Sequence, residues 1–384
     1  MGIDDSGAES DWGISLTSDT ATPTGTVLDT FERAVDMPAG VWDALLTADD
    51  FYLSSPWLAV VEATARVPMR YVIARRAEAA TAALATALLG TDAPWTLGRP
   101  DTLLDHSVAE ELAGAAALRA TLPDDLAGAL LPSLVCGGRH LGRTRIGLSA
   151  AANRADLGTM VEEAERIAES RSARSISYLY LDGRDHLLRE LLAAQGYLSH
   201  VSAGYCWLPL PAGGFDGYLK VLSAHRRRRV LAERRRLLLE GVDVRIEPFT
   251  PAVIARMAEL ETRLFAKYGM SSWRVEQSEE FLHQVHDLLG SRAVVSIARA
   301  GGEIRGFGLL LRFGDQWFAH RTGFDYGFQR KLPLYNEVLY HHPVEVAESM
   351  GIVAIHYGIG STEAKLLRGC KSVPQYSYIR VLER

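Results

Sequence analysis

Apolar positions along the chain switch repeatedly between helix spacing and strand spacing, and this alternation predicts a mixed α/β protein. In the C-terminal part, glycine turns at Gly301-Gly302 and Gly314-Asp315 separate β-branched runs. Strands are expected at 242–247, 293–299, 304–313, 316–324, 352–357 and 375–382. Helices are expected at 251–268, 275–289, 335–350 and 362–368, with Pro343 either kinking its helix or marking its first turn.

The N-terminal part repeats this order of elements more weakly. Strands are expected at 69–75, 81–89, within 131–147, at 176–181 and at 197–210, and helices at 155–170 and 185–195, with a helical Ala/Leu-rich insertion between Asp92 and Pro132. The repeat predicts two related domains, 26–212 and 242–384, joined by a helix within 213–241. Residues 1–25 are rich in Ser, Thr, Asp and Gly, which predicts a disordered tail.

Composition is that of an ordinary globular protein. The chain has 384 residues, of which 48% are hydrophobic and 23% charged, which leaves room for two domains. Cys136, Cys206 and Cys370 are widely separated and show no metal-ligand spacing, so neither disulfides nor a metal site is expected, and a reducing cytoplasm is favoured. No segment is long and apolar enough to predict a membrane span.

Charge is concentrated in the predicted connecting helix. The segment from Asp216 to Glu240 contains eight basic and three acidic residues. Its net charge is +5, in a chain whose overall charge is −6. Seven arginines within the eleven positions 226–236 repel one another unless an anion lies nearby, so the helix indicates a polyanionic partner. Alternatively, the arginines form an ordinary solvent-exposed face of the helix.

Three stretches carry a resemblance to a known family. They are Tyr218-Leu-Lys-Val-Leu-Ser-Ala-His-Arg-Arg-Arg-Arg, Tyr335-Asn-Glu-Val-Leu-Tyr-His-His-Pro and, above all, His356-Tyr-Gly-Ile-Gly-Ser-Thr-Glu-Ala-Lys-Leu-Leu-Arg-Gly-Cys370. Weaker matches lie at 51–57 and 134–139. With these stretches the chain resembles FemAB-like proteins of the GNAT superfamily, the tandem-GNAT aminoacyl or acyl transferases, from about residue 50 to its end.

The resemblance implies two tandem GNAT-like domains and an amide-forming transfer. In that chemistry an amine attacks an acyl group held as an ester on tRNA or as a thioester on coenzyme A, without a covalent enzyme intermediate or a permanently bound cofactor. Backbone N–H groups at a bulged strand stabilise the oxyanion, so a bulge is expected within 316–324.

The acyl carrier is the open question. Coenzyme A enzymes of this superfamily carry Arg/Gln-x-x-Gly-x-Gly/Ala before the helix that follows the fourth strand, where bare N–H groups hold the pyrophosphate. Here residues 325–336 lack the second and third small residues. This departure favours aminoacyl-tRNA as co-substrate, with the amine of a small molecule or of a cell-wall precursor as acceptor. An acyl-CoA-dependent N-acyltransferase and a non-catalytic basic module that binds nucleic acid or a phosphorylated precursor remain alternatives.

Candidate site residues follow from these motifs. The catalytic candidates are His320, Glu363, which could act as a base if partly buried, and Lys365. The substrate-binding candidates are Arg321, Tyr326, Asn336, Tyr357 and Arg368, and the carrier-binding candidates are Arg226, Arg227, Arg228, Arg229, Arg234, Arg235, Arg330 and Lys331. Because side chains alternate along a strand, only one of His320 and Arg321, and one of His356 and Tyr357, is expected to face the site.

Overall fold

One continuous sheet runs through the computed structural model, which describes residues 25–382 except 94–95, 139–142, 271 and 331. Within this described part the sheet has thirteen strands in the order β1-β2-β3-β4-β6-β13-β7-β12-β11-β10-β9-β8, with β5 paired to β3. The pairing mixes parallel contacts, as between β4 and β6 or β11 and β12, with antiparallel ones. The expected tail at 1–24 lies outside the described residues.

The N-terminal half contains the predicted strands and helices in the predicted order. Its strands are β1 (Thr26–Phe31), β2 (Met69–Arg76), β3 (Ala79–Leu89), β4 (Ser133–Cys136), β5 (Gly147–Leu148), β6 (Ser175–Asp182) and β7 (Leu198–Pro209). Its helices are α1 (Ala39–Asp43), α2 (Ser55–Ala65), α3 (Pro100–Ala109), α4 (Ala115–Ala120), α5 (Leu126–Leu130), α6 (Arg154–Ser170) and α7 (His186–Ala194). The helices α3, α4 and α5 form the predicted insertion.

The C-terminal half follows two connecting helices, α8 (Gly214–Val221) and α9 (Ala224–Leu239). Its strands are β8 (Asp243–Pro248), β9 (Ala293–Ala300), β10 (Glu303–Phe313), β11 (Gln316–Phe324), β12 (Ala354–Gly358) and β13 (Lys371–Val381). Its helices are α10 (Pro251–Lys267), α11 (Val275–Leu289), α12 (Tyr326–Gln329), α13 (Leu334–Asn336), α14 (His342–Ala347) and α15 (Thr362–Leu366). No helix in the described ranges combines the length and apolarity needed to cross a bilayer.

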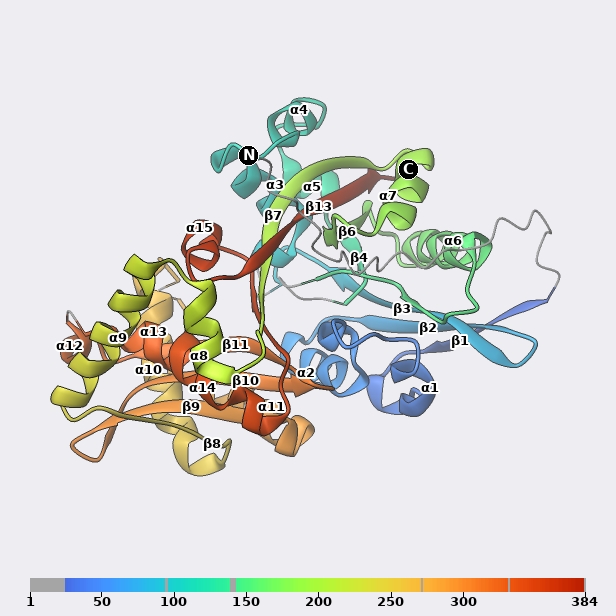
Figure 1. The fold of residues 1–384 in the computed structure, drawn as a ribbon. Helices are drawn as coiled ribbons and strands as arrows, with labels where there is room; N and C mark the ends of the chain where they lie inside the picture. The colour runs from blue at the N-terminus through green and yellow to red at the C-terminus, as the bar shows by residue number, and fades with distance from the viewer. Residues whose placement is uncertain (1–24, 94–95, 139–142, 271, 331, 383–384) are drawn as a thin grey trace, which may run out of the picture.

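The two halves exchange strands at the centre of the sheet. The last strand, β13, inserts between β6 and β7 and pairs antiparallel with both. In turn β7 pairs antiparallel with β12 of the C-terminal half. The long strands β7 and β13 therefore run side by side through the middle of the molecule (Figure 1). The division of the chain at residues 212 and 242 stays a prediction.

Alternating side chains place two cores on opposite faces of the C-terminal half of the sheet. Leu309 and Phe318 pack toward α10 and α11 on one face. The neighbouring residues Leu310 and Trp317 pack with side chains of α8 and α14 on the other. This division follows from the two-residue period of a strand. The first core also takes in Trp57 of α2, so both halves share one apolar interior.

The helix predicted at 335–350 contains a π-helical segment, Glu337–His341, immediately before α14. Pro343 lies in the first turn of α14, one of the two outcomes expected for it. Proline has no N–H to donate to the carbonyl of Leu339, four residues earlier. That carbonyl accepts a hydrogen bond from the hydroxyl of Tyr357 at 2.9 Å instead, which joins the helix to the end of β12.

Candidate functional site

A cavity of about 260 Å³ opens between the two halves where β11 and β12 separate. These parallel strands pair only over Gln316–Phe318 and Ala354–His356. Beyond that point, residues 319–321 of β11 and 357–359 at the end of β12 line the cavity. The N-terminal half closes it with Tyr52, Trp57 and Tyr180, among others. Its wall is mostly apolar and aromatic, as in many small-molecule sites.

The expected bulge is present in β11. Leu309 pairs with Arg321 and Leu310 with Ala319, so His320 is an extra residue in the ladder. Both His320 and Arg321 line the cavity. The expectation that only one of them would face the site was wrong, because the bulge interrupts the alternation on which it rested. At the end of β12, Tyr357 is among the residues that line the cavity and His356 is not, although the ring of Tyr357 stacks on Tyr340 in the core of the opposite face.

A second irregularity faces the same cavity from the N-terminal half. Tyr376 pairs with Leu181 and Tyr378 with Tyr178, so β6 also carries an extra residue against β13. Tyr180 has a φ of +59°, a left-handed conformation that costs a non-glycine residue about 1–2 kcal/mol. Its hydroxyl donates to the carbonyl of Leu97 at 2.8 Å. Strain of this kind concentrates at functional sites, and sequence reasoning did not identify Tyr180.

His320 is surrounded by aromatic side chains from both halves of the chain. Its ring centroid is 4.7 Å from that of Trp57 and 5.5 Å from that of Phe281. Trp57 comes from α2, within the weakly matching stretch at 51–57, and Phe281 comes from α11. The surround excludes much of the solvent and fixes the imidazole at the cavity wall, which is the placement that proton transfer needs.

Arg321 is buried against Glu261 of α10. Its Nη1 lies 3.3 Å from the Oε1 of Glu261, and its guanidinium lies 4.2 Å from the centre of the Phe281 ring. The hydroxyl of Ser278 donates to the other carboxylate oxygen of Glu261 at 2.5 Å. Burial raises the pKa of Glu261 and lowers that of Arg321, although each partner opposes the shift of the other. The pair brings charge to the cavity wall at a high desolvation cost.

Lys365 hydrogen-bonds to the backbone of the cavity wall that the end of β12 forms. Its Nζ donates to the carbonyls of Tyr357, Gly358 and Ile359 at 2.8, 3.0 and 2.7 Å, which uses all three of its donors. Burial lowers the pKa of Lys365 to about 8. This geometry fits a positioning residue, and its predicted catalytic role stays a prediction.

Glu363 does not meet the condition attached to its predicted role. Its side chain is exposed in the first turn of α15, and it is not among the residues that line the cavity. A general base gains from partial burial and from contact with the reacting groups, and the structure provides Glu363 with neither. An acidic residue in a first helical turn also complements the helix dipole.

A second hollow, here called the groove, lies between α9 and the start of α13. It has a volume of about 470 Å³ and is lined by Arg229, Arg236 and Asn336, among others. A smaller adjoining hollow is lined by Arg226 and Arg368. The two hollows therefore bring together four arginines from two distant segments of the chain. They lie beside residues 329–336, the segment that follows β11.

Glu233 and Asn336 organise the groove. The carboxylate of Glu233 accepts hydrogen bonds from Arg229 Nε and from Asn336 Nδ2, each at 2.8 Å. Asn336 Oδ1 in turn accepts from Arg368 at 2.7 Å. Burial opposes ionisation of Glu233, but the imidazole of His341 at 3.6 Å and the hydrogen bonds from Arg229 and Asn336 outweigh it and lower the pKa of Glu233 to about 2. The predicted substrate residue Asn336 thus lines the groove and Arg368 lines the adjoining hollow, and neither is among the residues that line the cavity.

The remaining carrier candidates are dispersed. Arg227 donates to the carbonyl of Leu222, and Arg228 and Arg235 are exposed on the outer side of α9. Tyr326 begins α12 with its ring 4.7 Å from Lys267 Nζ, and Arg330 is exposed after that helix with a φ of +39°. Lys331 lies outside the described residues.

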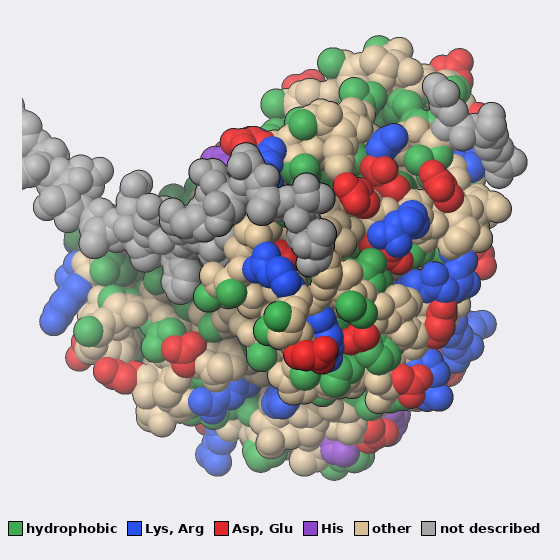
Figure 2. Space-filling view, turned by 90° about the vertical axis from the view of Figure 1, so that its right-hand side faces the viewer, with side chains coloured by type: hydrophobic (Ala, Val, Ile, Leu, Met, Phe, Trp, Pro, Cys, Tyr) green, Lys and Arg blue, Asp and Glu red, His purple; other side chains and the backbone are tan. Residues whose placement is uncertain are grey.

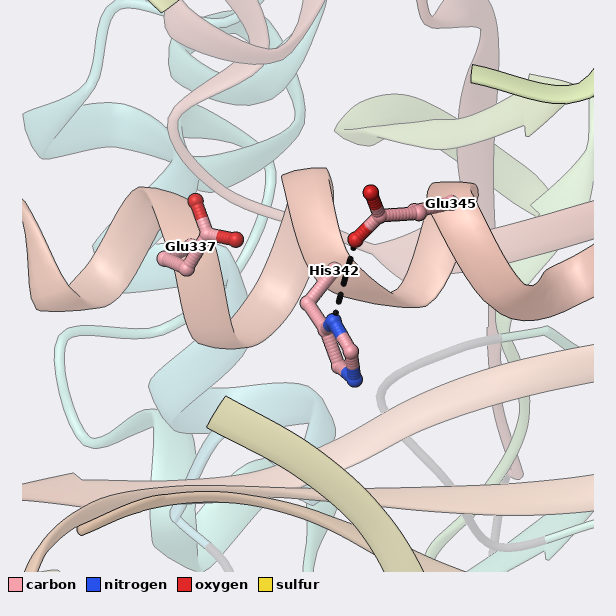
Figure 3. A group of neighbouring side chains, drawn as sticks. All are labelled: Glu337, His342 and Glu345. Carbon is pink, nitrogen blue, oxygen red and sulfur yellow. Dashed lines mark hydrogen bonds and ion pairs between the residues drawn. The ribbon is translucent and has the colours of Figure 1, made fainter. Parts of the chain in front are cut away.

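Arg234 is held in ion pairs within the protein. It contacts Glu337 at 3.0 Å and both carboxylate oxygens of Glu345. Figure 3 shows Glu337, His342 and Glu345 along one side of the helical segment, with the hydrogen bond from His342 to Glu345. These three offer ligand atoms within 4.8 Å of one another, but Arg234 already forms an ion pair with each of the two carboxylates. The cluster attaches α9 to α14, and we assign no metal to it.

A buried polar network joins the halves beside the cavity. His356 Nδ1 lies 3.0 Å from the hydroxyl of Tyr205, and its Nε2 lies 2.5 Å from the Oε1 of Gln316. Because an amide oxygen only accepts, Nε2 carries the proton and Nδ1 accepts from the tyrosine. Burial lowers the pKa of His356 to about 3, so its ring is neutral. Nearby, Arg143 forms ion pairs with Asp182 and Asp49.

A family model described as FemAB-like, peptidoglycan biosynthesis/recognition, matches residues 140–384. The chain belongs to the FemAB-like family. The resemblance expected from the sequence is therefore confirmed, and so is the fold class. No curated protein sequence matches the chain.

Solved structures share the fold of this FemAB-like chain. FemX aligns with a TM-score of 0.62 and 11% identity, covering 92% of this chain and 97% of its own. A tandem GNAT protein from the clavulanic acid biosynthesis pathway aligns at 0.51 and 12%, covering 93% and 99%. The C-terminal domain of a putative lysylphosphatidylglycerol synthetase from Agrobacterium fabrum aligns at 0.52 and 10%, covering 89% and 91%. The chain is thus a mixed α/β protein of tandem GNAT-like halves.

Proposed function

We propose that this FemAB-like protein is an amide-forming aminoacyltransferase, which moves an aminoacyl group from tRNA to the amine of a small molecule or cell-wall precursor. The observation that carries the proposal is the cavity at the separation of β11 and β12, which receives the bulged His320 from one half and Trp57 from the other. The family's description supports a cell-wall acceptor, and the GNAT-like fold supports a transferase.

The proposed reaction balances without a cofactor. The amine nitrogen attacks the carbonyl carbon of the ester, the amine proton passes to the imidazole of His320, and the C–O bond to the ribose breaks. The ribose oxygen then takes the proton, so the products are an amide and a deacylated tRNA. Backbone groups freed by the bulge at His320 stabilise the oxyanion in between. Arg321 orients a negatively charged part of the substrate against the cavity wall.

The groove supports tRNA as the carrier. Arg226, Arg229, Arg236 and Arg368 gather at the segment that follows β11, where coenzyme A enzymes of this fold use backbone N–H groups. Arginine side chains suit the phosphates of a nucleic acid backbone. On the opposite side of the molecule, acidic and basic side chains are intermixed (Figure 2), so the arginine concentration is a local property of α9.

The test combines binding with transfer. Purified protein is titrated with deacylated tRNA at several salt concentrations, and tRNA charged with radiolabelled amino acids is offered together with a soluble muropeptide that carries a free amine. Salt-dependent binding and a labelled amide product are expected. Arg229→Gln/Arg236→Gln should weaken tRNA binding and reduce the slope of log K against log salt by about one per lost phosphate contact.

Two results would redirect the proposal. Label transfer from acyl-CoA without tRNA binding would make the protein an N-acyltransferase that uses coenzyme A. Tight binding of tRNA or of a phosphorylated precursor with no amide product would identify a non-catalytic binding module.

An Arg228→Gln/Arg235→Gln variant, which removes the same charge from α9 outside the groove, is the matched control for the Arg229→Gln/Arg236→Gln variant.

A further inference from the structure

The helix α9 presents three faces with different surroundings. Val230 and Leu237, seven residues apart, form its buried seam. Arg229, Glu233 and Arg236 line the groove, and Arg226 lines the hollow that adjoins it. The rest of the helix faces outward at the edge of the molecule, on the side away from α6 and α1 (Figure 1). Neither the cavity nor the groove uses this outward face.

Arginine and leucine alternate along the outward face. Arg228, Leu231, Arg235, Leu238 and Leu239 occupy positions i, i+3, i+7, i+10 and i+11, which fall on one side of a helix. All five are exposed, and the leucines show 50%, 75% and 77% of their surface to solvent. Single exposed leucines are ordinary, but three on one face of a charged helix form a pattern that needs a partner.

The charges of the outward face are not neutralised within the protein. In the described part of the chain, neither Arg228 nor Arg235 forms an ion pair, whereas Arg229 pairs with Glu233 and Arg234 with Glu345. A partner for this face must therefore offer both anionic groups and an apolar layer.

We propose that the outward face of α9 docks on an anionic lipid surface. Lipid headgroup phosphates would bind the arginines, and the three leucines would enter the boundary between headgroups and acyl chains. An RNA backbone would satisfy only the arginines and leave the leucines in water. A second copy of the chain would bring two arginine-rich helices together, which repel. The proposal adds an interaction surface to the protein and does not depend on the proposed transfer reaction.

The experiment is vesicle flotation of the full-length protein. One set of vesicles is phosphatidylcholine alone, and the other contains about one-third phosphatidylglycerol, at low and moderate salt. The protein is expected to float only with the anionic vesicles, and less at moderate salt. Leu231→Ser/Leu238→Ser/Leu239→Ser, which changes only exposed side chains, should weaken this binding about tenfold or more.

A matched control separates this face from general surface apolarity. Leu198→Ser/Val353→Ser alters side chains that are 48% and 51% exposed elsewhere on the molecule, and it should float like the unaltered protein. Absence of flotation with anionic vesicles would overturn the proposal, and so would flotation that the triple leucine variant retains. If instead the triple variant lost affinity for tRNA while vesicles were never bound, the face would belong to RNA and the proposal would be wrong.

Discussion

The imidazole of His320 meets the indole of Trp57 edge to face, with ring centroids 4.7 Å apart, although the two residues belong to opposite halves of the chain. Trp57 is 1% exposed, so its position is fixed by the shared core. The contact means that the cavity is complete only when the halves are packed together. The orientation of the proposed base therefore depends on both halves.

Replacing His320 tests its proposed role as the base. His320→Gln keeps a polar side chain of similar size but cannot take the amine proton at neutral pH, so kcat should fall about 100-fold with little change in KM. Steady-state kinetics of the transfer reaction would measure this. His283→Gln, at an exposed position of α11, is the control. An unchanged kcat in His320→Gln would remove His320 from the mechanism.

The buried pair of Glu261 and Arg321 should behave as a unit. Glu261→Gln leaves the arginine charge without its counter-ion and should lower the free energy of unfolding by about 3 kcal/mol. Glu261→Gln/Arg321→Met removes both charges and should recover part of that loss. Urea unfolding of the single and double variants measures the difference. Additive losses would mean that the two side chains do not interact energetically.

Lys365 should act through the backbone of the cavity wall. Lys365→Met leaves the carbonyls of residues 357–359 without their donor, so faster amide hydrogen exchange in this segment and a lower kcat are expected. The pH dependence of the rate should keep its shape. If Lys365 instead took the amine proton, the rate would rise through its pKa of about 8, and that limb would vanish in the variant.

Stability should fall in mild acid because of His200. This residue of β7 is 2% exposed beneath the insertion, and burial lowers its pKa from 6.5 to about 4. The unfolded chain takes up a proton as the pH falls below about 6.5, while the folded protein does not until about pH 4. The part of the unfolding free energy that is linked to His200 is therefore fully present above about pH 6.5, and about 3 kcal/mol of it is lost by pH 4.

The acid dependence is measured by urea unfolding at about pH 7 and about pH 4.5. His200→Leu should lose less stability between these values than the unaltered protein. Some dependence should persist, because burial also lowers the pKa of His356 to about 3. His283→Gln, at an exposed position of α11, is the control for the loss of a histidine side chain. The same loss in His200→Leu as in the original chain would contradict the assignment.

Local pattern was sufficient for most elements. The predicted strand at 316–324 and helix at 275–289 match β11 and α11, because glycine turns and a clear helical period mark their limits. The insertion of β13 between β6 and β7 could not be predicted, since strand pairing depends on contacts between segments far apart in sequence.

The candidate site was only partly predictable for the same reason. His320, Arg321 and Tyr357 were found because they lie on or next to strands whose ends form the cavity. Tyr180 and Glu261 were missed, since their contributions come from a strained backbone and a distant ion pair that no motif records. The seven arginines of 226–236 appear as one feature in the sequence. The helical period of α9 directs them to different places: the groove, the ion pairs with α14 and the outward face.

The position of β13 has a consequence for how the protein is made. The strand that pairs with both β6 and β7 is β13, Lys371–Val381, which follows them in sequence only after the whole of β8–β12. During synthesis the N-terminal half leaves the ribosome long before this strand exists, and until then β6 and β7 have open edges that invite pairing with other chains. Until β13 is made, β6 and β7 therefore each lack one partner strand, and the N-terminal half cannot complete its sheet by itself.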